Sequence, residues 1–571
     1  MATKVTIINE VFVSLLLKIV YMYKIAIFFA FWCAWAGSLL AQKKYEVRAT
    51  WLTTLGGMDW PTQKANSPEG IQKQKDELCN ILDKLKEAHF NTILFQTRLR
   101  GDVIYPSYLE GYAECLTGCV GRNPGYDPLQ FAIEECHKRG LALHAWVVTL
   151  PIGSKRQVRL LGKHSVVVKH PQICKLFKNN WYLDPGEPET GNYLSNIIRE
   201  IVARYDVDGI HFDYLRYPEH GLRFPDYRSY RKYGKQQPLN QWRRDNLTQL
   251  VRRLYTEIKQ VKPWVIVSSA PIGKFNDTHR YRSLGWNAYE EVHQDAQRWM
   301  KTGIHDALFP MMYFRDNHFY PFALDWKEHK NGRWVVPGLG IYFLQTKGRE
   351  WQLDDVLQQI SFTRQYDLDG QAYFRNYFLL KNSKGIWTEL CQQLYATPAV
   401  TPPLTWLDSI APAAPILVQF YEGKEASVTL KWKPSSTQKP GGIYYRLYAS
   451  NTYPVDTQQG KNIQAIQISD TTYRYTPSLP WQKKLYWALT AVDRYGNESE
   501  PMACNTPQKQ TLPIYSSLPD IPKGYQLILT SPFGQELARI PRDPIPSGKG
   551  IYHIRLLSPN GTQELIGILS R

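Results

Sequence analysis

The stretch DVDGIHFDYLRYP at residues 206–218 decides how this chain folds. A short apolar run ends in an acid, Asp213, and a proline follows soon afterwards, which is typical of a buried strand in a parallel sheet. A carboxyl group at the end of such a strand is costly unless it is paired or used in chemistry. Asp213 is therefore the first residue that we predict to be functional, and an ion pair with Arg216 or Arg98 is the structural alternative. For Asp208, at the strand entrance, we expect a loop or capping role.

This strand is one of eight apolar segments that alternate with amphipathic helix patterns between Tyr45 and about Ala396. The alternation predicts an α/β fold, a (β/α)8 TIM barrel. An open, doubly wound sheet is the alternative, but its first strand usually runs into a glycine-rich phosphate turn. Residues 53–57 read TTLGG instead, with no helix start directly behind them. The expected strands are 46–54, 92–98, 141–149, 207–214, 265–271, 307–314, 334–343 and 370–375. The expected helices are 71–88, 128–138, 193–204, 242–261, 289–301 and 353–365, with the weakest pattern at 322–329.

The sequence pattern changes after the predicted barrel domain, 42–396. Prolines make residues 397–415 a stiff linker. Short alternating strands at 427–432, 444–449 and 486–492 then predict a β-sandwich over residues 416–507, which resembles a fibronectin type III domain, including Trp432 in its second strand. Such a domain serves as a spacer or a binding module. Residues 508–571 read as a small C-terminal β-domain with strands at 525–529, 550–557 and 564–569.

The N-terminus carries a targeting pattern. A short basic start at Met22 is followed by the apolar stretch Ile25 to Ala36 and by small residues up to Ala41. Residues 1–41 are therefore expected to be a secretory signal peptide, with Met22 as an alternative start. No later segment reaches the roughly 18 apolar residues of a membrane span. We expect an exported protein of the periplasm or the outer surface of a bacterial cell envelope.

Charge, aromatic content and cysteines narrow the class of partner. The net charge is +18, and without residues 1–41 it is +16, which suits an anionic partner such as cell-wall glycan. The basic residues are dispersed, however, and we find no nucleic-acid-binding module. Aromatic residues make up 13% of the chain; they either fill cores or stack on sugar rings. Cys115 and Cys119 lie in one glycine-rich loop and could bridge in an oxidising compartment.

Several motifs at the predicted strand ends resemble the glycosyl-hydrolase-like family usually labelled family-10-like. The resemblance covers about residues 45–395 and implies a barrel that acts on carbohydrate; some members are similar to enzymes that cleave peptidoglycan strands stripped of their peptides. Many members carry a second acid directly after the strand-four aspartate, where this chain has Tyr214. That difference keeps open a barrel that binds glycan without cutting it. The motifs are RATW at 48–51 with DWP at 59–61, FQTR at 95–98 with GDVIYPS at 101–107, HAW at 144–146, LDPG at 183–186, and the strand-four stretch.

Glycoside cleavage needs two carboxyl groups that flank the scissile bond. Asp213 supplies the first. For the second we expect Asp316 after strand six, because related barrels often pair acids from strands four and six, or Asp102 after strand two, where a loop-organising role is the alternative. Glu187 and Glu189 in the long third loop are further possibilities.

Residues that bind the substrate should surround these acids at the C-terminal ends of the strands. Arg98 could hold a carboxylate or orient a catalytic acid, while the aromatic residues could stack on sugars or belong to the core. Strand one lacks the His-x-His pair of metal-dependent barrels, so we predict no metal and no cofactor, and an amidase or deacetylase is disfavoured. No phosphate loop, nucleophile elbow or nucleotide fingerprint is found. The predicted binding residues are Arg98, Trp51, Trp146, His144, Tyr214, Arg216, Tyr313, Tyr373 and Arg375.

Overall fold

The computed structural model divides the chain into two compact units, one up to Asn505 and one from Thr506. The expected signal peptide and the alternative start at Met22 lie outside the described residues. None of the helices that the structure describes is both long and apolar enough to cross a membrane. The described residues are 43–219, 223–234, 236–348, 350–423, 427–476, 485–507, 514–548, 550–559 and 563–570.

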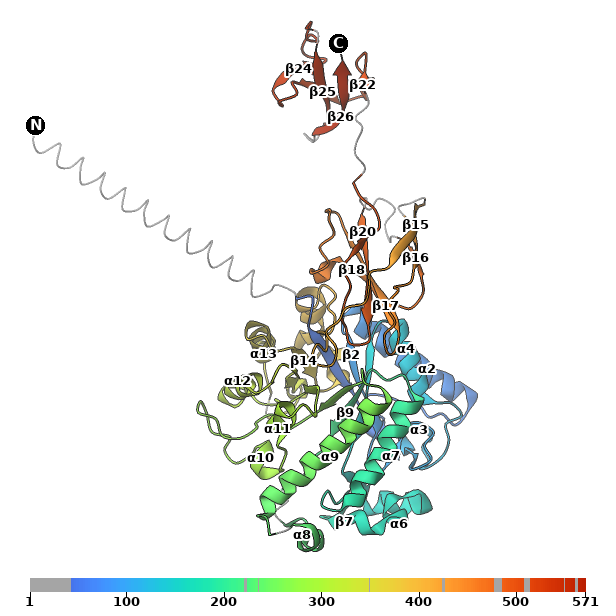
Figure 1. The fold of residues 1–571 in the computed structure, drawn as a ribbon, viewed down its shortest axis with the longest axis vertical. Helices are drawn as coiled ribbons and strands as arrows, with labels where there is room; N and C mark the ends of the chain where they lie inside the picture. The colour runs from blue at the N-terminus through green and yellow to red at the C-terminus, as the bar shows by residue number, and fades with distance from the viewer. Residues whose placement is uncertain are drawn as a thin grey trace, which may run out of the picture. The chain divides into compact units, whose positions relative to one another are not determined.

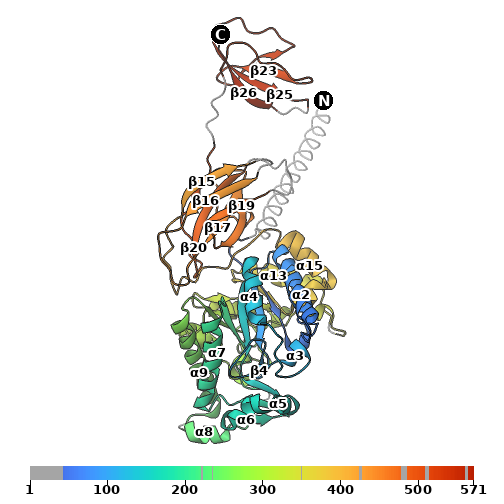
Figure 2. The ribbon, with the colours of Figure 1, turned by 90° about the vertical axis from the view of Figure 1, so that its right-hand side faces the viewer.

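Eight parallel strands close into a barrel in the first unit, as predicted (Figures 1 and 2). The pairing order is β12-β11-β10-β9-β5-β2-β1-β14-β13. Since β12 and β13 are two pieces of the seventh strand, the ring is closed. The break between them contains Pro337, which has no N–H to donate to a strand ladder. The strands are β1 (Val47–Leu52), β2 (Thr92–Arg98), β5 (Ala142–Val148), β9 (Gly209–Asp213), β10 (Ile266–Ser269), β11 (Ala307–Leu308), β12 (Trp334–Val335), β13 (Gly338–Leu339) and β14 (Gly370–Tyr373).

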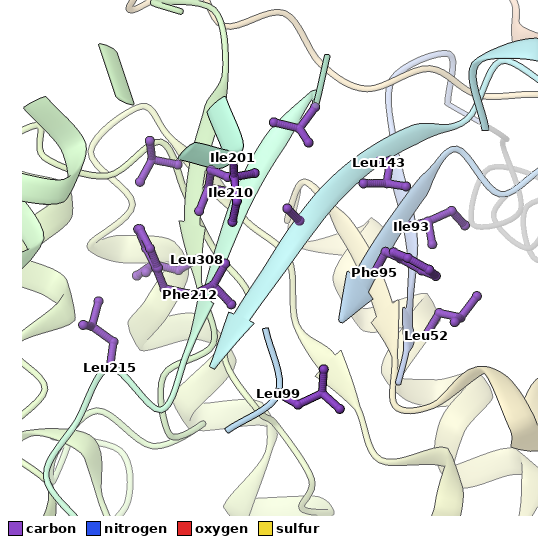
Figure 3. Close-up of a cluster of buried hydrophobic side chains, with 14 of the residues drawn as sticks. Leu52, Ile93, Phe95, Leu99, Leu143, Ile201, Ile210, Phe212, Leu215 and Leu308 are labelled. Atoms are coloured by element: carbon purple, nitrogen blue, oxygen red, sulfur yellow. The ribbon is translucent and has the colours of Figure 1, made fainter. Parts of the chain in front are cut away.

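Helices surround the barrel, and apolar side chains fill the layer between the two. Ser67 and Asp127 cap the first two long helices, and a proline follows each cap, which is a favourable helix start. Figure 3 shows outward-facing strand residues of this layer, such as Phe95 and Phe212. The expected helix 289–301 is divided into two short ones. The helices are α2 (Pro68–Glu87), α3 (Glu114–Thr117), α4 (Pro128–Lys138), α7 (Pro188–Arg204), α8 (Tyr227–Tyr233), α9 (Leu239–Val261), α10 (Ala288–Glu291), α11 (Ala296–Lys301), α12 (Tyr320–Glu328), α13 (Leu353–Gln365), α14 (Asn376–Leu380) and α15 (Ile386–Glu389).

The connection after strand three contains a small antiparallel sheet, where the sequence predicts only a long loop. Its antiparallel sheet has the order β6-β8-β7, and it leads into α7. Because this sheet starts directly after β5, it lies at the C-terminal end of the barrel. Its elements are β6 (Pro151–Ser154), α5 (Lys155–Leu161), α6 (Val166–Lys169), β7 (Cys174–Phe177) and β8 (Asn180–Leu183).

Two antiparallel sheets follow the barrel and enclose a core that contains Trp432 and Trp487. The fibronectin type III likeness of this part stays a prediction. Residues expected to form a linker instead pack on the barrel: Leu404 and Leu407 join its interior cluster, and Trp406 donates to Asp306 over 2.9 Å. The sheets contain β15 (Ile416–Glu422), β16 (Val428–Lys433) and β19 (Thr472–Tyr475) in one layer, and β17 (Ile443–Ser450), β18 (Ile463–Ile468), β20 (Tyr486–Asp493) and β21 (Met502–Ala503) in the other.

The second unit is a five-stranded sheet in the order β22-β26-β25-β23-β24. Its small core includes Leu527, Ile554 and Leu569. The three strands expected from the sequence correspond to β23, β25 and β26. The strands are β22 (Ile514–Tyr515), β23 (Gln526–Thr530), β24 (Glu536–Ile540), β25 (Ile551–Leu557) and β26 (Gln563–Ser570).

We expect Gly209→Ala to destabilise the barrel. A Cβ atom at Gly209 would lie 2.6 Å from Cγ of His144 on the neighbouring strand, and the ring of that buried histidine cannot easily move. Overpacking of this kind costs about 1–3 kcal/mol, so the midpoint of urea unfolding should fall. Gly550→Ala is the matched control, because its Cβ would come no closer than 3.7 Å to a neighbour. Equal midpoints for the two variants would contradict the predicted clash.

Candidate active site

Asp213 ends β9, and its carboxyl group is buried beside the tryptophan of the preceding barrel strand. Trp146 Nε1 donates to Asp213 Oδ2 over 3.1 Å, and the backbone N–H of Tyr214 donates to Oδ1 over 2.7 Å. Burial raises the pKa of Asp213, while the positive charges of Arg216 and Arg100 partly oppose the shift. Such a carboxyl group can keep its proton at a higher pH than an exposed aspartate and can therefore donate it.

Neither ion pair considered as a structural alternative for Asp213 forms. Among the described residues, Arg98 pairs with Glu110, and the nearest carboxylate to Arg216 is Glu219, at 3.4 Å. The expected role of Asp208 agrees better with the structure, since its carboxylate accepts from the backbone of Leu143 and contacts His137.

A cleft of about 320 Å³ opens at the C-terminal end of the barrel next to Tyr214, the residue after Asp213; Asp213 itself is not among the residues that line it. It lies where barrel enzymes place their sites, between the ends of β2 and β9 and the three-stranded sheet of the third connection. Of the predicted binding residues, Tyr214 and Arg216 line it. The full lining is Arg100, Pro151, Gly153, Phe177, Lys178, Asn180, Tyr182, Tyr214, Arg216, Pro218 and Glu219.

Tyr214 and Arg216 lie against each other in this cleft. The Arg216 guanidinium is 4.7 Å from the centroid of the Tyr214 ring, a distance at which a cation is attracted to an aromatic face. Tyr214 has a positive φ of 50°, and 37% of its surface is exposed. The residue that replaces the second acid of the family motif is thus an accessible aromatic surface next to a cation.

Aromatic residues extend the site on the side of strands six to eight. The ring centroid of Tyr313 is 5.4 Å from that of Phe374 and 5.7 Å from that of Tyr342. Burial and the nearby charge of Asp213 raise the pKa of the Tyr313 phenol, so its hydroxyl group stays protonated. Tyr313 thus feels the charge of Asp213 but does not line the 320 Å³ cleft, and its role in binding stays a prediction.

The structure contradicts a binding role for Arg98 and Tyr373. A register shift separates Gln96 from Arg98, so that Arg98 is paired with Val147, whose side chain belongs to the layer between strands and helices. There the Arg98 side chain is fully buried against Glu110. Tyr373 likewise points out of the barrel, because side chains alternate along a strand; its hydroxyl group contacts that of Tyr395.

His144, Trp51 and Arg375 are also placed differently from the prediction. His144 points into the barrel, but it lines a cavity with Trp264 and Tyr495, on the side of the β-sandwich. Trp51 is only 2% exposed and donates to His211 Nε2 over 3.1 Å, so it belongs to the barrel core. Arg375 is bound to Asp59 and to the carbonyl of Met58.

Residues 46–345, more than half of the chain, match the family described as glycosyl hydrolase-like 10. The chain belongs to this family. It is a glycoside hydrolase.

Two relatives of this glycosyl hydrolase-like 10 protein have glycosyl hydrolase in their names. Glycosyl hydrolase YngK of Bacillus subtilis (strain 168) is 31% identical over 483 residues, which cover 81% of this chain and 93% of YngK. Glycosyl hydrolase DigH of Escherichia coli (strain K12) is 34% identical over 293 residues, or 48% of this chain and 66% of DigH. Among solved structures, the PgaB (BpsB) glycoside hydrolase domain from Bordetella bronchiseptica aligns with a TM-score of 0.43 and 13% identity, covering 61% of this chain and 98% of that one.

The acids predicted as partners of Asp213 in this glycosyl hydrolase-like 10 site lie in different surroundings. Asp102 is buried, and burial raises its pKa to about 6; its oxygens accept from the backbone of Arg100 and from Gln157, each over 3.0 Å. This is the loop-organising role given as the alternative. Asp316 is exposed at the start of a 3-10 turn, Asp316–His318.

Glu189, one of the acids of the third connection, accepts from Gln172 and contacts His170. Glu187 is the N-cap residue of α7, although its side chain makes no capping hydrogen bond. Glu219, in contrast, lines the cleft itself. It follows strand four by only six residues, so its position after the strand-four motif was the signal that could have identified it.

Cysteines and metal-ligating groups add nothing to this site. Cys115 and Cys119 are both free thiols in the structure. Within the described ranges, no group of three or more His, Cys, Asp or Glu side chains could hold a metal ion. The predicted absence of a metal stays a prediction.

Proposed function

We propose that this protein is exported and hydrolyses peptide-free peptidoglycan strands, with Asp213 as the general acid. The observation that carries the proposal is the position of Asp213: a buried carboxyl group at the C-terminal end of β9, hydrogen-bonded to Trp146 and followed directly by Tyr214, which lines the cleft. Burial keeps its proton available for the leaving-group oxygen when the glycosidic bond breaks.

A second carboxylate must then attack the sugar or activate a water molecule. We propose Asp316 for this role, as the acid that follows strand six. Glu219 is the alternative candidate, because it lines the cleft. Asp316→Asn and Glu219→Gln therefore separate them: the variant of the true partner should lose hydrolysis, whereas the other should retain it.

The proposal of export rests on the sequence of residues 1–41, and that of a wall substrate rests on charge. The basic start, the apolar stretch and the small residues up to Ala41 form a signal-peptide pattern. A net charge of +16 without that segment suits an anionic wall polymer. Cell fractionation with N-terminal sequencing should find the protein outside the cytoplasm and beginning at Gln42; a cytoplasmic protein that retains residues 1–41 would contradict export.

The substrate is tested by incubating the purified protein with peptide-free peptidoglycan strands and with a panel of other polysaccharides, and by following new reducing ends. We expect reducing ends from the peptide-free strands. If reducing ends appear only from another polysaccharide, the proposed wall substrate is refuted, but the protein remains a hydrolase. Binding of the strands without reducing ends from any substrate would contradict catalysis in this site.

The pH dependence of the reaction should reveal Asp213 as the acid. Because its pKa is raised, the active, protonated form is lost as pH rises through that pKa, and kcat/KM should fall on the alkaline side. A 4-nitrophenyl glycoside has a leaving group that needs little protonation, so with that substrate the alkaline fall should flatten. The measurement is kcat/KM against pH for both substrates; identical alkaline limbs would exclude Asp213 as the proton donor.

A further inference from the structure

The cleft next to Tyr214 contains more positive charge than cleavage of a neutral sugar requires. Three cationic side chains line it, those of Arg100, Lys178 and Arg216, and Glu219 is the one acid among its lining residues. We propose that these cations form a subsite for a carboxylate group carried by a sugar, so that the enzyme selects acidic glycans. This inference rests on the proposed function in so far as that function makes the cleft the substrate site.

Arg216 is the main donor of this subsite. Its side chain is only 5% exposed, and its Nε has no hydrogen-bond partner among the described residues. Among the residues that the structure describes, the neighbouring Nη2 contacts only Glu219, at 3.4 Å, a carboxylate that is itself 52% exposed. A buried guanidinium with an unused donor is costly, and an incoming carboxylate that takes two parallel N–H bonds along this edge would remove the cost.

Tyr214 fixes the orientation of that guanidinium. The 4.7 Å stacking distance holds the guanidinium plane near the Tyr214 ring, and a guanidinium that is oriented beforehand loses less side-chain entropy when it binds an anion. The tyrosine that replaces an acid in the family motif thus has a consistent explanation. An acid at that position would take up the charge of Arg216, whereas the phenol leaves the charge for the substrate.

Arg100 and Lys178 reach the same cleft from two other elements. Arg100 follows β2 and lines the cleft, and its positive charge acts on Asp213, Tyr214 and Tyr182. Lys178 lies in the turn between β7 and β8. The rings of Tyr182 and Tyr214 provide apolar faces in the same cleft, so a sugar ring and its carboxylate can be bound together.

The test compares carboxylated and neutral substrates with Arg216→Gln. On peptide-free peptidoglycan strands, whose muramic sugars carry a lactyl carboxylate, the variant should lose about ten- to a hundredfold in kcat/KM, mainly through KM. On the same strands after reduction of the carboxyl groups to alcohols, wild type and variant should be equal. Arg199→Gln, which removes an exposed arginine of α7 paired with Glu257, should behave as wild type on both. An equal loss on both substrates would overturn the subsite.

Binding distinguishes failure of the subsite from failure of the proposed function. Titration calorimetry with the Asp213→Asn protein should show that N-acetylmuramic acid binds better than N-acetylglucosamine, and that Arg216→Gln abolishes the difference. This result would stand even if the strands are not cleaved. Oligogalacturonate is the third ligand: preference for it over the muramic sugar would keep the carboxylate subsite but assign it to uronates. No preference for any carboxylated ligand would refute the subsite directly.

Discussion

Asp213→Asn should lower kcat on the cleaved polysaccharide by about 10²- to 10⁴-fold, the range that general acid catalysis contributes. The amide has nearly the same shape, and its single oxygen can still accept from either Trp146 Nε1 or the backbone of Tyr214, but not from both. It cannot donate a proton to the leaving oxygen. The fall should therefore appear in kcat, with KM changed little, as measured by release of reducing ends.

Stability provides the control for this variant. Since burial raises the pKa of Asp213, the carboxyl group favours folding fully only at low pH, below its unfolded pKa, and that contribution is lost as pH rises through the folded pKa. At pH 7 the amide removes the cost of a buried charge but gives up one of the two accepted hydrogen bonds, worth about 1 kcal/mol, so Asp213→Asn should unfold at a temperature close to that of wild type. An inactive variant that melts well below wild type would mean that activity was lost through the fold.

A 4-nitrophenyl glycoside provides the second control. If Asp213 only protonates the leaving group, the variant should retain much of its activity on this substrate, because nitrophenolate leaves without help. An equal loss on the aryl glycoside and on the polysaccharide would instead assign Asp213 as the nucleophile or as a residue that binds the transition state. The ratio of the two losses therefore identifies its role.

The barrel itself could be predicted because its signals are local. Each strand is an apolar run next to a helix pattern, and the predicted segments 92–98, 128–138 and 353–365 agree with β2, α4 and α13. Strand six is shorter than predicted: only Ala307–Leu308 forms a regular strand, since the next positions include Pro310. Sequence reasoning had no comparable signal for the sheet of the third connection, whose strands are four residues long.

The site was harder to predict because the direction in which a side chain points changes from one residue to the next along a strand. Placement at a strand end selected Asp213 and Tyr313 as site residues, but it does not say which way a side chain points. Tyr373 lies one residue from the inward-facing Ala372 and points the opposite way. Lys178 and Tyr182 reach the cleft only because an inserted sheet folds back over the barrel end, which no local pattern reveals.

Arg98 shows most clearly how one register shift changes a prediction. Gln96 is paired with Trp146 in the barrel interior, and normal alternation would have turned Arg98 the same way, toward the cleft. The shift pairs Arg98 with Val147 instead, and bulges of this kind re-aim a side chain. The guanidinium then donates to both oxygens of Glu110 and to the carbonyls of Val148 and Thr149.

Arg98→Met should consequently destabilise the barrel by about 3–5 kcal/mol, the cost of breaking a buried ion pair. Both side chains of the pair are fully buried, so the variant leaves the Glu110 carboxylate with the Tyr193 hydroxyl group as its remaining side-chain donor among those described. The double variant Arg98→Met with Glu110→Gln removes the orphaned charge and should recover part of the loss. Urea unfolding of the three proteins measures both effects.

Catalysis distinguishes this structural role from the binding role that the sequence suggested. If Arg98 acts only through the fold, the double variant, once folded, should cleave carboxylated and neutral strands in the same ratio as wild type. Arg216→Gln should change that ratio while leaving the unfolding midpoint close to that of wild type. A double variant of normal stability that has lost its preference for carboxylated strands would return Arg98 to the cleft and would mean that the shift after Gln96 is absent in solution.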